Sequence, residues 1–302
     1  MRPVSGPPAA PWSLVEQRHA SPLGRWTMVL ACPPAPLDRW VEAVWTSRGE
    51  GVFTQESILP RTPTEVLFAL GETHWLRDPS DPARDRAYTR AFVSGLHMTP
   101  LAVESPPDSE MAGIRLRPAG AAAFLRDSPS AIAGAVIDLD ALLGSGVESL
   151  RDELAAVRDL RQRVLRLAAA VERHLGAAGE LPAAIRRALA ELRRSGGTVA
   201  IAALVADSGW SHRHFASRFR YAIGLGPKAF ARIARFETAF SRLQSLSRVR
   251  WAEFALDCGY FDQAHLIRDF GELAGTTPTE ILRRRAPDGI GLLDEEELLR
   301  RE

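Results

Sequence analysis

The chain has 302 residues, 46% of them hydrophobic and 25% charged, which is typical of a soluble globular protein and excludes a largely disordered chain. Its two cysteines, Cys32 and Cys258, are too few for a thiolate zinc site or a disulfide scaffold. No apolar run approaches the roughly 20 residues that span a membrane. The N-terminus also lacks the apolar core of a secretory signal. We therefore expect a cytoplasmic protein with no membrane partner.

The formal net charge of +1 conceals an asymmetry along the chain. Residues 1–145 carry 13 basic and 16 acidic side chains, whereas residues 180–286 carry 17 basic and 10 acidic ones. Residues 146–179 are nearly balanced, and residues 287–302 are acidic. One basic block between acidic neighbours indicates a polyanionic partner for one domain only.

Short apolar runs separated by Pro and Gly characterise residues 1–145. Such runs, with turn residues between them, predict an all-β barrel or sandwich. The predicted strands are residues 25–31, 40–45, 65–71, 91–96 and 112–117. The polar stretch 78–90 is predicted to be a flexible loop.

Residues 148–175 contain no Pro or Gly and repeat Leu or Val at steps of three and four residues. This spacing predicts one long amphipathic helix or two shorter ones. The apolar stripe either packs on the barrel of its own chain or forms the seam of a homodimer, and the sequence leaves both alternatives open. Residues 176–180 follow as a short linker, and the tail 287–302 is predicted to be a terminal helix.

The basic block contains an internal duplication with a period of about 51 residues. Each copy predicts a helix-turn-helix unit, because a short apolar helix ends at a glycine that can adopt the left-handed conformation of a sharp turn. A Ser or Asp then follows as the N-cap of the next helix. Corresponding residues of the copies 201–227 and 251–278 are Val205 and Ala255, Gly209 and Gly259, Ser211 and Asp262, Phe215 and Leu266, Phe219 and Phe270, Gly224 and Gly275, and Pro227 and Pro278.

The second helix of each copy turns its aromatic and leucine side chains inward and presents a polar face outward. Arg, Gln and small apolar side chains on such a face suit guanine, adenine and thymine in a major groove. These residues are His212, Arg213, Ala216, Ser217 and Arg220 in the first copy, and Gln263, Ala264, Ile267 and Arg268 in the second. The predicted connecting helix 227–245 is about 27 Å long, which allows the two faces to lie about one DNA turn apart.

The run GWSHRHFASRF and the motif GYFDQAHLIRDF, which is followed by GTTP, resemble the DNA-binding domain of AraC/XylS-type transcriptional regulators. The resemblance covers residues 181–285 and implies a bipartite DNA-binding domain beside a separate sensing or dimerisation domain. The segments PLDRWVEAVW, FVSGL and IRLRPAGAAAFL resemble the small cupin-like barrel of a subgroup of this family.

The resemblance implies base-reading positions at Arg213, Ala216, Ser217, Gln263, Ala264, His265, Ile267 and Arg268. Two positions depart from the family pattern. Ser217 stands where Arg is common, which predicts weaker base reading by the first helix. Val205 stands where Ala is usual, which predicts a slightly wider helix pair. For His265 a structural hydrogen bond and a DNA contact are both open.

Motifs for catalysis are absent from the sequence, which contains no phosphate-binding glycine loop, nucleophile elbow or dinucleotide motif. The histidines of residues 1–145, His19, His74 and His97, lack metal-ligand spacing, and His212 and His214 point apart on a helix. We therefore expect no catalytic residue, metal or cofactor. Trp12, Trp26, Trp40, Trp45 and Trp75 either pack in the core or line a ligand pocket.

The sequence predicts an α+β chain in which a small cupin-like β-barrel precedes an all-α bipartite helix-turn-helix domain. The expected domains are a sensor barrel at 1–145, a helical linker with possible dimerisation at 146–179, a DNA-binding domain at 180–286 and an acidic tail at 287–302. The expected function is regulation of transcription through double-stranded DNA, controlled by a small-molecule effector or partner at the barrel. The alternatives are a cupin-like enzyme fused to a DNA-binding domain, and a barrel that serves only for protein interaction.

Overall fold

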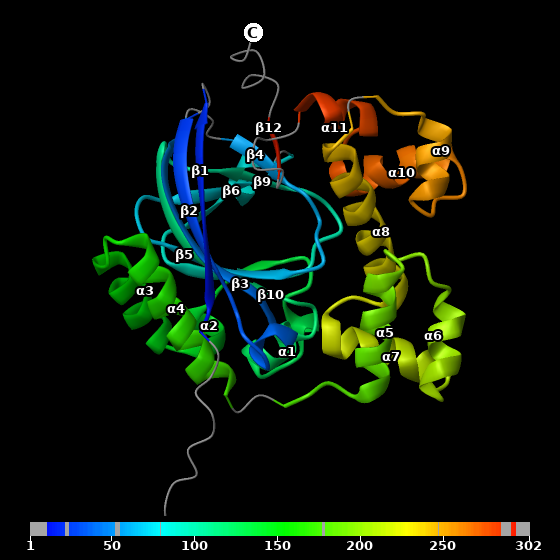
Figure 1. Cartoon of the computed structure of the whole chain (residues 1–302), viewed down its shortest axis with the longest axis horizontal. Helices are drawn as coiled ribbons and strands as arrows, with labels where there is room; N and C mark the ends of the chain where they lie inside the picture. The colour runs from blue at the N-terminus through cyan, green and yellow to red at the C-terminus, as the bar shows by residue number, and fades with distance from the viewer. Residues whose placement is uncertain are drawn as a thin grey trace, which may run out of the picture.

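The computed structural model describes residues 11–21, 24–51, 55–78, 80–176, 179–246, 248–284 and 291–293. A β-rich N-terminal part precedes a helical C-terminal part, and the two lie side by side (Figure 1). The mixed α+β class expected from the sequence is confirmed.

The β-rich part consists of two sheets among the described residues, which corrects the expected single barrel. The larger sheet has the order β1-β2-β3-β10-β5-β8-β11, and the smaller has the order β12-β4-β9-β6-β7. All of the described pairings are antiparallel. The strands are β1 Ser13–Ser21, β2 Gly24–Cys32, β3 Val41–Gly51, β4 Gln55–Ile58, β5 Thr64–Ala69, β6 His74–Arg77, β7 Arg86–Tyr88, β8 Ala91–Ser94, β9 Leu101–Glu104, β10 Asp108–Leu116, β11 Val136–Asp138 and β12 Gly291–Leu293.

All five predicted apolar runs fall in strands of the larger sheet, namely β2, β3, β5, β8 and β10. The polar stretch 78–90 is only partly a loop, because Arg86–Tyr88 pairs with β6 as β7. The predicted terminal helix is wrong at Gly291–Leu293, which pairs with β4 as a strand. The rest of that tail lies outside the described residues.

The predicted amphipathic segment forms two helices, α3 Gly146–Ala156 and α4 Leu160–Leu175. The break falls at Asp159, whose Oδ1 caps α4 by accepting a hydrogen bond of 2.8 Å from the Gln162 amide. The apolar stripe of α4 packs on β2 and β3 of the same chain. This stripe is therefore part of the core and is not available as the seam of a dimer.

Short helices complete the β-rich part, and seven helices make up the described C-terminal part. The short helices are η1 Leu37–Arg39, η2 Pro82–Arg84, α1 Gly120–Leu125, η3 Pro129–Ala131 and α2 Asp140–Leu143. The C-terminal helices are α5 Ala183–Arg194, α6 Ile201–Ser208, α7 His212–Ile223, α8 Pro227–Gln244, α9 Trp251–Asp257, α10 Gln263–Ala274 and α11 Pro278–Arg284.

The predicted duplication is confirmed as two helix-turn-helix units, α6–α7 and α9–α10. Gly209 and Gly259 have φ angles of 68° and 76°, in the left-handed region that the sharp turns require. Ser211 Oγ accepts a hydrogen bond of 3.3 Å from the His214 amide, and Asp262 Oδ1 accepts one of 2.7 Å from the His265 amide. Both predicted N-caps are therefore formed.

Replacement of a buried and of an exposed leucine on α4 should lower the stability of the protein by different amounts. Leu167 is fully buried against the sheet, so Leu167→Ala should lower the free energy of unfolding by about 2–5 kcal/mol. Leu165 is 44% exposed, so Leu165→Ala should change it by no more than about 0.5 kcal/mol. Urea unfolding of both variants measures the difference, and equal losses would contradict the packing of α4.

Candidate functional site

Helix α7 presents the first predicted recognition face to solvent. His212, Arg213, Ser217 and Arg220 are exposed, and Ala216 is half-buried. The opposite face is fixed in the core, because Phe215 and Phe219 are completely buried. The structure therefore brings the predicted residues of this unit together on one accessible surface.

Helix α10 presents the second face in the same way. Gln263, Ala264, Ile267 and Arg268 are exposed, while Leu266 and Phe270 are completely buried. His265 differs from these residues, because it is half-buried and its Nδ1 accepts a hydrogen bond of 3.3 Å from the Phe261 amide. Its ring also meets Tyr260 edge-on at 5.2 Å, so the structural hydrogen bond expected as one alternative is present, and a DNA contact by the half-buried ring stays a prediction.

An aromatic side chain beside the second face escaped the sequence analysis. Phe261 is 84% exposed and precedes Asp262, the N-cap of α10. Ile267 on the same helix is 40% exposed, so apolar groups accompany Gln263 on this surface. No pattern in the sequence marks this phenylalanine as exposed, and only the structure identifies it as part of the face.

A buried ion pair holds α10 on α8. Arg232 Nε lies 2.5 Å from Asp269 Oδ1, and its Nη2 lies 2.5 Å from Glu272 Oε2. Asp269 is only 4% exposed, and burial of its carboxylate without the Arg232 partner would be strongly unfavourable. Arg268 takes part in none of the ion pairs found among the described residues, since Arg232 occupies both neighbouring carboxylates. The Arg268 side chain is therefore accessible to solvent.

Helix α8 belongs to the cores of both units. Its N-terminal part supplies Phe230 and Ala231 to the core of the first unit. Its remaining length supplies Phe236 and Phe240, among others, to the core of the second. Figure 1 shows α8 running from the α5–α7 group to the α9–α11 group. Eighteen residues give this helix a length of about 27 Å.

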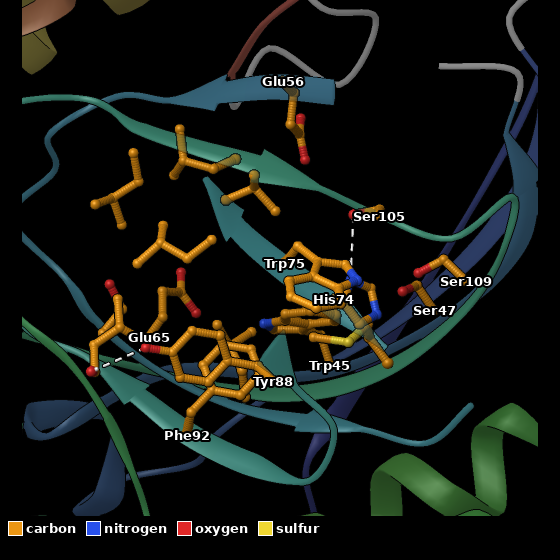
Figure 2. Close-up of a pocket in the computed structure, with 18 of the residues that line it drawn as sticks. Trp45, Ser47, Glu56, Glu65, His74, Trp75, Tyr88, Phe92, Ser105 and Ser109 are labelled. Atoms are coloured by element: carbon orange, nitrogen blue, oxygen red, sulfur yellow. Dashed lines mark hydrogen bonds between the residues drawn. The ribbon is translucent and has the colours of Figure 1, made fainter. Parts of the chain in front are cut away.

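A cavity of about 330 Å³ lies between the two sheets of the β-rich part. Both sheets line it, the larger through Trp26 and Trp45 and the smaller through His74 and Trp75. Figure 2 shows Trp45, His74, Trp75, Tyr88 and Phe92 gathered in one region. Of the tryptophans proposed as pocket or core residues, Trp26, Trp45 and Trp75 line this cavity, Trp40 is buried in the core, and Trp12 packs at the core's edge.

Several polar groups in the cavity wall are buried. His74 Nδ1 lies 3.2 Å from Ser105 Oγ, and His97 Nε2 lies 3.1 Å from Ser94 Oγ. Burial lowers the pKa of each of these histidines to about 4. Both rings are therefore neutral at neutral pH. Their spacing in the sequence was relevant only to metal binding, and no local pattern indicates that these histidines face one cavity.

Two segments of the cavity wall also contact the helix-turn-helix units. Leu59, which follows β4, enters the core of the second unit, and Leu96, which follows β8, enters the core of the first. Next to Leu59, Thr62 Oγ1 donates a hydrogen bond of 2.7 Å to Glu237 Oε2 on α8. Leu59 and His97, the neighbour of Leu96, both line the cavity. The cavity and the two units therefore share structural segments.

Within the described residues, no three His, Cys, Asp or Glu side chains are placed to hold a metal ion. Nor does any described helix have the length and apolar character needed to cross a membrane.

Residues 204–284 match the family described as "Helix-turn-helix domain", and residues 31–138 match a "Domain of unknown function". No curated protein sequence matches the chain. Among solved structures, ToxT from Vibrio cholerae with a bound unsaturated fatty acid is 12% identical, with a TM-score of 0.42 over 76% of this chain and 91% of ToxT. ToxT bound to (E)-4-(8-methylnaphthalen-1-yl)but-3-enoic acid is 12% identical, with a TM-score of 0.44 over 76% and 94%.

The family match, the duplicated motif and the two exposed recognition faces define the C-terminal part as a helix-turn-helix DNA-binding domain with two units. The chain is a DNA-binding transcriptional regulator whose helix-turn-helix domain resembles that of the AraC/XylS type.

Acidification should destabilise the protein through the two cavity histidines. Their pKa is about 4 in the folded chain but about 6.5 when exposed, so between these values the unfolded chain binds more protons. The stabilisation is complete above pH 6.5 and is lost as the pH falls toward 4, by at most about 3 kcal/mol per histidine. Urea unfolding at pH 7 and pH 5 measures the loss. The double variant His74→Gln, His97→Gln should lose less than the parent, and an equal loss in both proteins would be the contrary result.

Proposed function

We propose that the faces of α7 and α10 read two successive major-groove segments and that α10 contributes more of the base specificity. The proposed contacts are His212, Arg213, Ala216, Ser217 and Arg220 on α7, and Gln263, Ala264, His265, Ile267 and Arg268 on α10. The observation that carries the proposal is the exposed set of Gln263, Ile267 and Arg268, opposite the buried side of α10. These groups suit adenine, a thymine methyl and guanine respectively.

The side chains on the exposed face of α7 support a smaller contribution of this helix to base specificity than that of α10. Beyond Arg213, its face offers Ala216 and Ser217, whose side chains are too short to reach far into a groove. Arg220 lies nearer the end of the helix and suits a phosphate, which fixes the register without reading sequence.

We further propose that residues 1–145 sense an effector and that residues 180–286 bind DNA. The support is the cavity whose wall includes Leu59 and His97, next to contacts with both units. An occupant of the cavity would contact segments that hold the units, and could shift the two units together against the β-rich part. In this proposal residues 146–179 support the sheet against which α4 packs. The two sheets are an opened variant of a cupin-like barrel. The acidic tail 287–302 is not part of the DNA-binding domain.

We propose that the regulator acts in the cytoplasm. We also propose that it acts without catalysis, since the sequence contains no motif typical of an active site. A homodimer stays a prediction, and it would need a surface other than the buried stripe of α4. The rival function, a barrel that only binds a partner protein, predicts an empty cavity and no response of DNA binding to small molecules.

Replacement of Arg268 and of Arg220 should affect DNA binding in different ways. Arg268→Ala should cost about 1–3 kcal/mol on the best site and relax the preference at one or two base pairs. Arg220→Ala should weaken binding to all sequences alike and flatten the log–log salt dependence by about one unit. Binding-site selection followed by salt titration measures both effects.

Arg84→Ala is the matched control, because Arg84 is an exposed arginine of η2 in the β-rich part. This variant should bind DNA as the parent does. An unchanged motif with Arg268→Ala, together with loss of the motif with Arg213→Ala, would assign the specificity to α7 instead.

A further inference from the structure

We propose that the cavity between the two sheets binds an uncharged, flat and largely apolar molecule that carries a hydroxyl group. That this molecule acts as the effector rests on the function proposed above, whereas its chemical class rests on the cavity alone.

The apolar and flat character follows from the side chains of the wall. Trp26, Trp45, Trp75, Tyr88 and Phe92 line a volume of about 330 Å³, which is within the range of small-molecule sites. Aromatic side chains in this number favour a ring system that can stack on them or meet their edges.

The polar requirement follows from two buried nitrogen atoms. Trp45 Nε1 and His74 Nε2 have no hydrogen-bond partner among the described residues, and both residues line the cavity. Leaving such buried groups unpaired is unfavourable, so a ligand that pairs with them gains affinity. The indole N–H of Trp45 can only donate, which requires an acceptor on the ligand.

A hydroxyl group meets the needs of His74 in either tautomer. His74 Nδ1 lies at hydrogen-bond distance from Ser105 Oγ, as the dashed line in Figure 2 marks. If Nδ1 donates to Ser105, Nε2 accepts from the ligand hydroxyl; if Nδ1 accepts, Nε2 donates to it. A hydroxyl oxygen can also accept from Trp45 Nε1, so hydroxyl chemistry suits each of the two residues.

The absence of charge on the ligand follows from the ion pairs of the wall. Each of its described arginines already faces a carboxylate: Arg48 pairs with Glu110, Arg61 with Glu237, and Arg115 with Glu65. An anion would therefore enter the cavity without a free cation to balance it. Glu65 Oε1 lies 2.6 Å from Arg115, so the carboxylate offers little net charge to a cationic ligand, and its buried Oε2, which has no partner among the described residues, can accept a hydrogen bond from a neutral donor. Burial of a charge without a partner is strongly unfavourable.

Calorimetric titration of the full chain at pH 7 tests the ligand class with three probes of one ring system. These are 2-naphthol, the 2-naphthoate anion and the 2-naphthyltrimethylammonium cation. We expect 2-naphthol to bind at least tenfold more tightly than either charged probe. Tighter binding of a charged probe, or no binding of any probe up to 1 mM (roughly −4 kcal/mol), would overturn the proposal.

Two variants test the polar contacts separately. Trp45→Phe and His74→Phe should each weaken 2-naphthol binding about tenfold, the effect of one lost hydrogen bond to a buried group. Trp251→Phe in α9 is the matched control and should bind 2-naphthol as the parent does. Unchanged affinity in both cavity variants would overturn the assigned contacts, and the second variant keeps the test valid should the first fail to fold.

A separate measurement distinguishes the ligand class from the proposed effector role. The affinity for a selected DNA site is measured with and without saturating 2-naphthol. A ligand that binds the cavity but leaves DNA affinity unchanged would overturn control through the cavity and leave the ligand class intact. Failure of all probes to bind, with DNA binding preserved, would overturn the ligand class and leave the DNA-binding function intact.

Discussion

The burial of the apolar face of α8 by two separate cores is the constraint on which the DNA-binding part depends. Phe230 belongs to the first core and Phe236 to the second, so neither unit can move without disturbing this helix. Close packing makes such a helix a stiff connection. The ion pair between Arg232 and Asp269 adds a directional contact, because it holds α10 at one position along α8. The relative placement of the two recognition faces is therefore a property of the core.

The β-rich part contacts both helix-turn-helix units through two of its loops. Leu59 and Leu96 are contributed by two different loops, and each completes the core of a different helix-turn-helix unit. Since both loops also border the cavity, the wall of the cavity is in direct contact with both units. Contacts of this kind couple two sites when they have more than one arrangement of similar free energy. The hydrogen bond between Thr62 and Glu237 is a contact that such a rearrangement would break or remake.

Local patterns predicted most of the helical part, whereas contacts between distant segments escaped prediction. The turn glycines and the caps Ser211 and Asp262 act within a few residues, so sequence sufficed to find them. The short strands β6, β7 and β12 lack an apolar run and depend on their neighbours in the sheet. A ligand pocket among the tryptophans was one expected alternative, but its polar wall could not be predicted, because Trp45 and His74 lie on different sheets and meet only through the tertiary fold. Phe261 escaped for a related reason, since exposure of an aromatic residue is decided by the packing around it.

The most direct test of a rigid α8 is the affinity for a selected DNA site into which base pairs are inserted between the two half-sites. Recognition faces about one turn apart, roughly 10 base pairs, require a fixed spacing and a fixed face of the duplex. An insertion of five base pairs turns one half-site to the opposite face. The account predicts that this insertion lowers affinity to that of a single half-site. Affinity retained within about threefold would show that the units move independently, and would contradict the account.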